Sequence, residues 1–181
     1  QTNHYVVNFA SLTPAIETYL RRYCNVSNLR GFLSRRAGIL CSEATLPTSN
    51  LATAEVKDTF MGVPQEFAHT RLYTDLDFTF YIDEDYTLLK IFEGWMEYIS
   101  SGANRRTRQL DKGYYRRMVY PDTYKVDSMY ITKFEKNYHA QLKYRFINAF
   151  PKAITPVPVS YGDADVLRVT VSFNFDRYVV L

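Results

Sequence analysis

Five carboxylates close together in the middle of the chain are the first residues that could do chemistry. Paired carboxylates act as general acids and bases or hold divalent cations. They are Asp75, Asp77, Asp83, Glu84 and Asp85. Asp75 and Asp77, however, alternate with apolar residues as on the solvent face of a strand, and the other three precede a helical pattern, where acids cap a helix. We therefore expect a wet strand face and a helix cap, with no catalytic residue and no metal.

Histidines, cysteines and glycines form no other pattern that is typical of a catalytic or ligand-binding site. His4, His69 and His139 are dispersed, with no Ser or Cys signature beside them that would indicate a nucleophilic triad. Cys24 and Cys41 are too few for a disulfide scaffold and lack the partners of a zinc site. No GxxxxGK[ST] or GxGxxG loop is present to hold a phosphate. We expect a protein that is not an enzyme, has no cofactor, and keeps two buried free thiols.

A basic stretch with two tyrosines is the one feature that resembles a nucleic-acid surface. Guanidinium groups pair with phosphates and tyrosine rings stack on bases, so the stretch is a candidate nucleic-acid-binding module. Arginine and tyrosine are equally favoured at protein interfaces, so contact with a neighbouring subunit is the alternative. The candidate residues, which flank Tyr114 and Tyr115, are Arg105, Arg106, Arg108, Arg116 and Arg117.

Length and composition indicate one globular domain, residues 1–181, that is rich in sheet. Apolar residues make up 46% and charged residues 23%, which is ordinary for a globular protein, whereas 16 Tyr and 12 Phe favour pleated, half-buried surfaces. The net charge of +3 does not by itself imply a polyanionic partner. No apolar run approaches the roughly 20 residues of a membrane helix, so we expect no membrane anchor and an intracellular site of assembly.

Hydrophobic periodicity predicts the elements that must position these residues. Alternation with a period of two predicts strands at 70–82, 139–150 and 166–175, and more weakly at 4–9, 37–44, 54–61 and 125–134. Three prolines make 151–158 a connection or an edge strand. Helical spacing predicts a covering helix at about 86–101, ended by Gly102, and a short extra helix at about 14–23 capped by Thr13. We expect a mainly β fold, an antiparallel sandwich or barrel with one covering helix.

From Cys41 to the C-terminal end, the order of segments resembles the tail tube proteins of contractile-tailed bacteriophages. The segments are Ser42-Glu43-Ala44-Thr45-Leu46-Pro47, Phe60-Met61-Gly62-Val63-Pro64, Leu76 to Asp85, Phe92-Glu93-Gly94-Trp95-Met96, Tyr120-Pro121, Tyr144 to Pro151, and Leu167 to Tyr178. This resemblance implies a virion structural protein whose homohexameric rings stack into the inner tail tube, the conduit for genome ejection. It also implies partners: sheath, baseplate and tail terminator proteins, and viral DNA passing through the lumen without sequence-specific binding.

The resemblance further implies roles for particular segments. The loop at about Glu55 to Phe67 matches the contact between stacked rings, and the strand at 139–150 matches the lumen sheet, with Gln141, Lys143 and Arg145 facing the lumen. Residues 10–40 are a helix-bearing insertion, which leaves open a baseplate-proximal tube initiator or a head-proximal tube terminator of the same fold. The candidate ring-stacking residues are Glu55, Lys57, Phe60, Met61, Gly62, Gln65 and Phe67.

Overall fold

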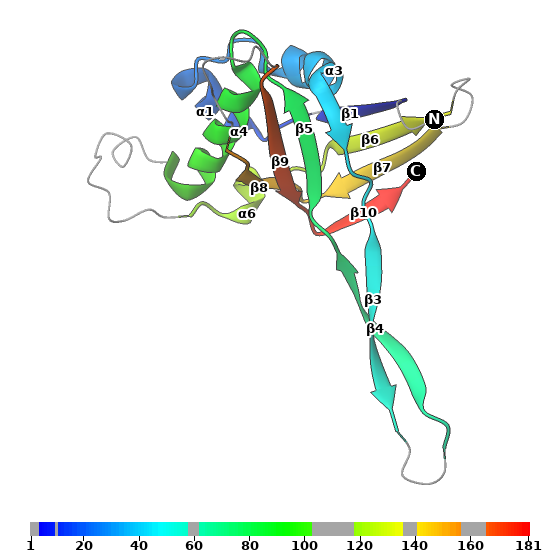
Figure 1. The fold of residues 1–181 in the computed structure, drawn as a ribbon. Coiled ribbons are helices and arrows are strands. Elements are labelled where there is room, and N and C mark those ends of the chain that lie inside the picture. The colour runs from blue at the N-terminus through cyan, green and yellow to red at the C-terminus, as the bar shows by residue number, and fades with distance from the viewer. Residues whose placement is uncertain (1–3, 10, 58–61, 103–117, 136–140, 157–165) are drawn as a thin grey trace.

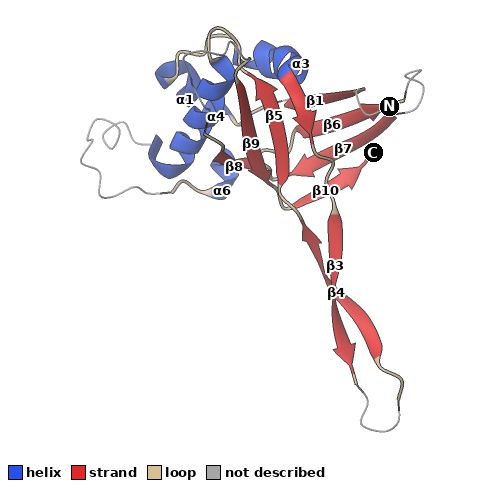
Figure 2. Cartoon of the chain, in the orientation of Figure 1, coloured by secondary structure: helices blue, strands red, loops and turns tan. Residues whose placement is uncertain are grey.

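The computed structural model describes residues 4–9, 11–57, 62–102, 118–135, 141–156 and 166–181. In these residues, two antiparallel four-stranded sheets and a layer of helices form a body, from which a long two-stranded hairpin projects (Figures 1 and 2). The expected mainly β fold with antiparallel sheets and few helices is confirmed.

The first sheet, sheet A, has the strand order β1-β6-β7-β10, and every neighbouring pair is antiparallel. The second, sheet B, has the order β2-β5-β9-β8, again antiparallel throughout. The strands of sheet A are β1 (Tyr5–Phe9), β6 (Met129–Phe134), β7 (Gln141–Ile147) and β10 (Arg177–Val180). Those of sheet B are β2 (Cys41–Ala44), β5 (Leu76–Tyr81), β8 (Phe150–Ile154) and β9 (Arg168–Asn174).

Along the chain, helices lie between β1 and β2 and between β5 and β6. The long helix α4 (Thr87–Glu97) continues into a π-helical turn, η2 (Tyr98–Gly102), which together confirm the helix expected at about 86–101. The helix expected at 14–23 is α1 (Pro14–Tyr23), and the Thr13 hydroxyl accepts a hydrogen bond from the backbone N–H of Ile16. The remaining helical segments are α2 (Leu29–Gly31), η1 (Phe32–Arg36), α3 (Ala37–Leu40) and α6 (Pro121–Tyr124).

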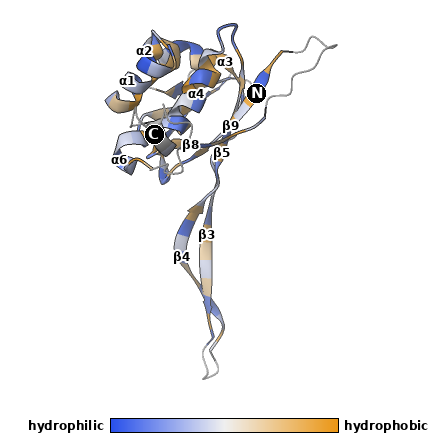
Figure 3. Ribbon diagram, turned by 90° about the vertical axis from the view of Figure 1, so that its left-hand side faces the viewer, coloured by the Kyte–Doolittle hydropathy of each residue, from blue (hydrophilic) through white to orange (hydrophobic). Residues whose placement is uncertain are grey.

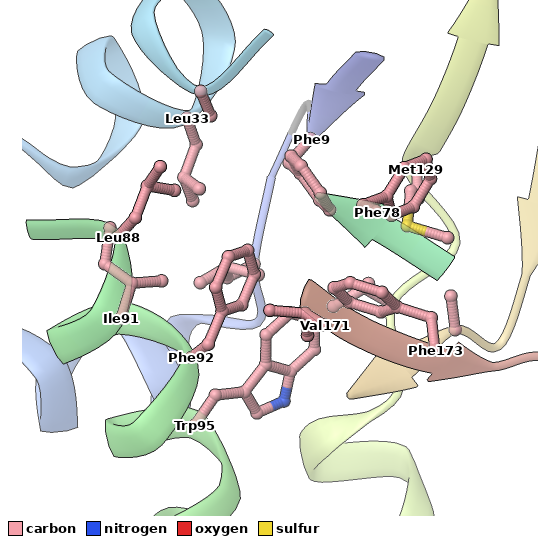
Figure 4. Packing of buried hydrophobic residues seen from close by; sticks show 14 of the residues in the cluster. Phe9, Leu33, Phe78, Leu88, Ile91, Phe92, Trp95, Met129, Val171 and Phe173 are labelled. Carbon is pink, nitrogen blue, oxygen red and sulfur yellow. The ribbon is translucent and has the colours of Figure 1, made fainter. Parts of the chain in front are cut away.

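A cluster of aromatic rings joins both sheets and α4 in one core (Figure 4). Phe9 of sheet A has its ring centroid 5.8 Å from that of Phe173 in sheet B and 6.0 Å from that of Phe92 on α4. Because these rings meet, sheet A and α4 cover the same face of sheet B. Trp95 is 1% exposed, and its indole N–H donates to the Tyr124 carbonyl at 3.1 Å. These tightly packed, fully buried rings dominate the energy that holds the layers together.

Two of the expected strands are wrong in their extent. The strand expected at 70–82 is two strands: residues 70–73 end the hairpin, Thr74 and Asp75 interrupt the ladder, and β5 starts at Leu76. Leu72, expected in the core, is 52% exposed. The strand expected at 139–150 ends at Ile147, because Asn148 adopts a left-handed conformation (φ 58°) that asparagine tolerates.

Some of the strands that were predicted more weakly are confirmed, and others are wrong in part. The strands at 4–9 and 125–134 are confirmed as β1 and β6, and the edge strand within 151–158 is confirmed as part of β8. The strand at 37–44 is half wrong, since its first half is the helix α3. The strand at 54–61 begins earlier, at Ser49 in β3 (Ser49–Val56), and residues 58–61 lie outside the described residues.

Trp95→Ala tests the aromatic core. The substitution removes a fully buried ring and leaves the Tyr124 carbonyl without its donor, so we expect the free energy of unfolding to fall by ~3–5 kcal/mol. Chemical denaturation followed by circular dichroism measures the change. Tyr120→Ala, at a side chain that is 77% exposed, is the matched control and should change little. Equal stability of the two variants would show that Trp95 is not part of the core.

Gly38→Ala tests the contact between α3 and the outer edge of β1. A Cβ at Gly38 would overlap the backbone carbonyl oxygen of Val7, which cannot move without disturbing the strand. We expect a loss of about 1–3 kcal/mol of stability in the same unfolding experiment. Gly31→Ala is the control, since its Cβ would meet the end of the Asn28 side chain, which can rotate away. A Gly38→Ala protein as stable as the Gly31→Ala protein would contradict the close packing.

Candidate assembly surfaces

The hairpin of β3 and β4 (Gln65–Tyr73) extends well away from the body in both side views (Figures 1 and 3). Most of its side chains are exposed, including large apolar ones: Leu51, Val56, Phe67 and Leu72 are each more than half exposed. An isolated two-stranded hairpin is at best marginally stable in water, because it has no sheet or helix to cover a hydrophobic face. The hairpin therefore has the composition and position of a surface that another chain covers.

The predicted ring-stacking residues lie in the distal part of this hairpin. Glu55 pairs with Glu66 across the ladder, and Gln65 and Phe67 flank Glu66 on β4. The Lys57 ammonium is 3.3 Å from the Glu55 carboxylate. Gly62 lies just before β4, whereas Phe60 and Met61 lie outside the described residues. The sequence placed a loop here and missed the two long strands that carry it.

The predicted lumen residues share one face of β7, on the side of sheet A that faces away from the core. Arg145 pairs with Tyr130 and Lys143 with Thr132 in the ladder, so these side chains lie together. The Lys143 ammonium is 4.6 Å from the centroid of the Tyr130 ring, and the Arg145 Nε–H donates to the Asp127 carbonyl at 3.2 Å. The four strands of sheet A contain no acidic residue. The charged side chains on this face are therefore basic and partly held by neighbours, and they lie beside two exposed apolar side chains, Val6 and Val179.

The outer edges of the two sheets differ in how well they are protected. The α3 helix packs on the edge of β1 at Gly38, and β8 carries Pro151, which has no N–H to offer a further strand. On the edge of β10 that faces away from β7, no described strand pairs with it. Val180 is 51% exposed, and Leu181 after the strand is 63% exposed. The β10 edge is thus able to pair with a strand of another protomer.

The strand carboxylates behave as the alternation predicted, whereas of the three acids expected to cap the helix only Asp83 does so, and the first turn of α4 contains no acidic residue. Asp75 forms an ion pair with Lys152 on the wet face of sheet B, and this hydrogen bond lowers the pKa of the Asp75 carboxyl. Asp77 accepts a hydrogen bond from Ser172. Asp83 Oδ1 accepts the Thr87 N–H at 2.9 Å at the start of α4. Among the described residues, no three His, Cys, Asp or Glu side chains group as metal ligands would.

Neither cysteine forms a disulfide, and of the two thiols expected to be buried only Cys41 is, since Cys24 is half-buried. Cys41 is poorly suited to nucleophilic chemistry. Burial raises the pKa of the Cys41 thiol to about 12, so almost no thiolate exists near neutral pH.

The candidate arginines at 105–117 and His139 lie outside the described residues. Within the described ranges, no helix has both the length and the apolar character needed to cross a bilayer.

Solved structures with the same architecture come from contractile injection systems. A chain in the six-fold symmetrised cryo-EM structure of the anti-feeding prophage baseplate aligns with a TM-score of 0.61 at 12% identity, covering 100% of this chain and 94% of that one. Chains of the PVC extracellular contractile injection system align from its sheath/tube terminator (TM-score 0.56, 10% identity, 100% and 95% coverage) and from its sheath-tube complex (0.53, 10%, 100% and 90%). At these identities, the likeness shows a shared fold.

The sequence has no match among curated proteins, but it matches a family model. That model is described as phage tail tube protein, and the match covers residues 1–181. Because the match covers the entire chain, this protein belongs to the phage tail tube protein family and is a structural protein, not an enzyme.

Proposed function

We propose that the chain is a subunit of homohexameric rings that stack into the inner tail tube of a contractile phage tail, the conduit for genome ejection. The observation that carries this proposal is the projecting β3–β4 hairpin, whose exposed apolar side chains no described element of the same protomer covers. A protein that acts alone rarely exposes such a surface, whereas a subunit buries it in the assembly.

Ring closure is the first step of the proposed assembly, and the free edge of β10 supports it. A strand of the neighbouring protomer that paired there would extend sheet A from subunit to subunit and remove an edge that otherwise invites aggregation. Repeated around six subunits, this pairing would form a closed wall without edges only if α3 left room beside Gly38 for the neighbour's β10 on β1, the opposite edge of sheet A.

The polar face of sheet A supports a lumen role for Gln141, Lys143 and Arg145. DNA would slide along such a wall only if the wall bound its phosphates weakly. Each phosphate that pairs with a cationic side chain releases a counterion, and this release increases the affinity. Holding Lys143 over the Tyr130 ring and Arg145 at the Asp127 carbonyl reduces their freedom to reach a phosphate. Weak binding without sequence preference is therefore the expected behaviour of this face.

The hairpin is the proposed contact between stacked rings, and its length suits that role. It reaches away from the body, so its distal residues can contact a protomer of the next ring while its base stays in its own (Figure 1). Sheath, baseplate and tail terminator proteins are the other partners that we propose, in the virion of a phage assembled in the host cytoplasm.

A tube initiator next to the baseplate, or a terminator at the head end, is the second candidate function. Segment 10–40 supports it, because α1, α2, η1 and α3 add a helix-bearing insertion to the two sheets, as a specialised member of the same fold would carry. The likeness to chains from a baseplate structure and from a sheath/tube terminator structure agrees with such an end position.

Deleting Glu55 to Phe67 tests the stacking role. The aromatic core lies in the body, so the shortened protein should keep its melting temperature within a few degrees but form no rods. Negative-stain electron microscopy and circular dichroism measure the two properties. Long rods formed by the folded deletion variant would refute the role of the hairpin in stacking.

Labelling of a cysteine at Lys143 tests the lumen assignment. In assembled tubes, Lys143→Cys should react with a small maleimide but be protected from a maleimide on a polymer wider than the bore. Glu93→Cys, on the exposed side of α4, is the matched control and should react with both reagents. If the bulky reagent labelled Lys143→Cys equally fast in tubes and in free protomers, β7 would not face the lumen.

A further inference from the structure

The β3–β4 hairpin has one face without charges and one face with charges. Residues that lie opposite each other in an antiparallel ladder project to the same face, and successive residues alternate. The charged face carries Glu55, Glu66 and Arg71 beside Ser49, Leu51, Thr53, Ala68 and Tyr73. The uncharged face carries Asn50, Ala52, Ala54 and Val56 on β3, with Gln65, Phe67, Thr70 and Leu72 on β4.

A β-bulge on β4 creates this division. Phe67 and Leu72 are five positions apart and would lie on opposite faces of a regular strand. The ladder pairs Ala52 with Thr70 but the next residue, Thr53, with Ala68, so His69 is an extra residue. That shift brings Phe67 and Leu72 to the same face as Val56, which gathers three exposed apolar side chains. The sequence pattern of β4 is therefore arranged to build one apolar face.

A groove on the body offers a matching surface. It has a volume of about 800 Å³ and lies between β1 and β2, with η1 and α3 forming one wall. Its apolar rim is exposed: Val6 is 45%, Leu46 is 44% and Ile39 is 81% accessible. The groove follows β2, the outermost strand of sheet B, where the Tyr5 hydroxyl donates to the Cys41 carbonyl at 3.1 Å. A groove of this size and character accepts several apolar side chains.

The back of the hairpin carries two glutamates, and the rim of the groove carries an exposed arginine. Glu55 and Glu66 face each other directly across the hairpin, an arrangement that repels, and Lys57 pairs with Glu55 alone. The groove is lined by Arg35, Lys133 and Glu43. Arg35 is exposed on η1, and among the described residues no carboxylate pairs with it. A guanidinium at the rim would relieve the repulsion between the two glutamates.

We infer that the groove between β1, β2 and α3 receives the uncharged face of the hairpin from a second copy of this chain. This inference rests on the proposed stacking of rings and names the two surfaces that meet. Val56 and Phe67, at the distal end of the hairpin, enter the groove against Val6, Ile39 and Leu46, while Arg35 reaches Glu66 on the back of the hairpin.

The contact is heterologous, because each copy offers its hairpin at one place and its groove, beside α3, at another. Figure 3 shows the hairpin projecting away from α3. Such contacts repeat without limit, so one copy can be bound by its hairpin and by its groove at once. The inference also gives segment 10–40 a role: η1 and α3 build the wall that the hairpin meets.

Complementary blocking variants test this contact. Phe67→Asp disables the hairpin and Ile39→Asp disables the groove, so each variant alone should need at least about tenfold more protein to assemble than the wild type. Leu51→Asp is the matched control: it adds the same charge at an equally exposed site on the opposite face and should assemble normally. In an equal mixture, the intact hairpin of Ile39→Asp can enter the intact groove of Phe67→Asp, but neither variant can form the next contact. The mixture should therefore form two-layer particles without rods. Analytical ultracentrifugation and negative-stain microscopy count the layers.

The outcomes separate this inference from the proposed function. Rods of Phe67→Asp as long as those of Leu51→Asp, or a mixture that stays unassembled, would overturn the pairing of hairpin and groove while stacking stands. Wild-type protein that never forms multimers would overturn both. As an independent check of Arg35, Arg35→Glu should weaken assembly and Glu66→Arg in the same chain should restore it; failure of the second change to restore assembly would remove Arg35 from the contact.

Discussion

The exposed hairpin is the constraint on which the rest of this structure depends. A two-stranded ribbon cannot bury its own apolar side chains, and Val56, Phe67 and Leu72 are each more than half exposed. In the assembly that we propose, a neighbouring chain covers the hairpin and stabilises it. The body, by contrast, is held by its own aromatic rings, which leaves the protomer able to fold before it assembles.

The body protects some of its sheet edges and leaves others for partners. Gly38 lets α3 lie directly on the edge of β1, and Pro151 limits pairing on β8, whereas β10 and the groove beside β2 stay accessible. An edge that is neither covered nor blunted is a place for specific pairing or for aggregation. In a member of the tail tube family, these two accessible edges suit the two directions of growth, around a ring and along a tube.

Local patterns predicted the helices well and the long-range pairing less well. Thr13 with Pro14, and the acids before Thr87, specify helix starts through contacts a few residues apart. The strand at 70–82 was misread because its alternation continues across Thr74 and Asp75, although the chain leaves the hairpin there and enters sheet B. Similarly, the hairpin sequence has no Asn-Gly pair that would indicate a tight turn. The bulge at His69 also breaks the alternation of β4, so the uncharged face can be recognised only from the pairing of β3 with β4 in the structure.

Hydrogen–deuterium exchange of the β3 and β4 amides, compared between free protomers and assembled particles, tests the central claim most directly. If a neighbour stabilises the hairpin, its amides should exchange quickly in the protomer and become strongly protected on assembly, while the amides of β5 and β9 stay slow in both. Hairpin amides that exchange at the same rate in both states would contradict the account.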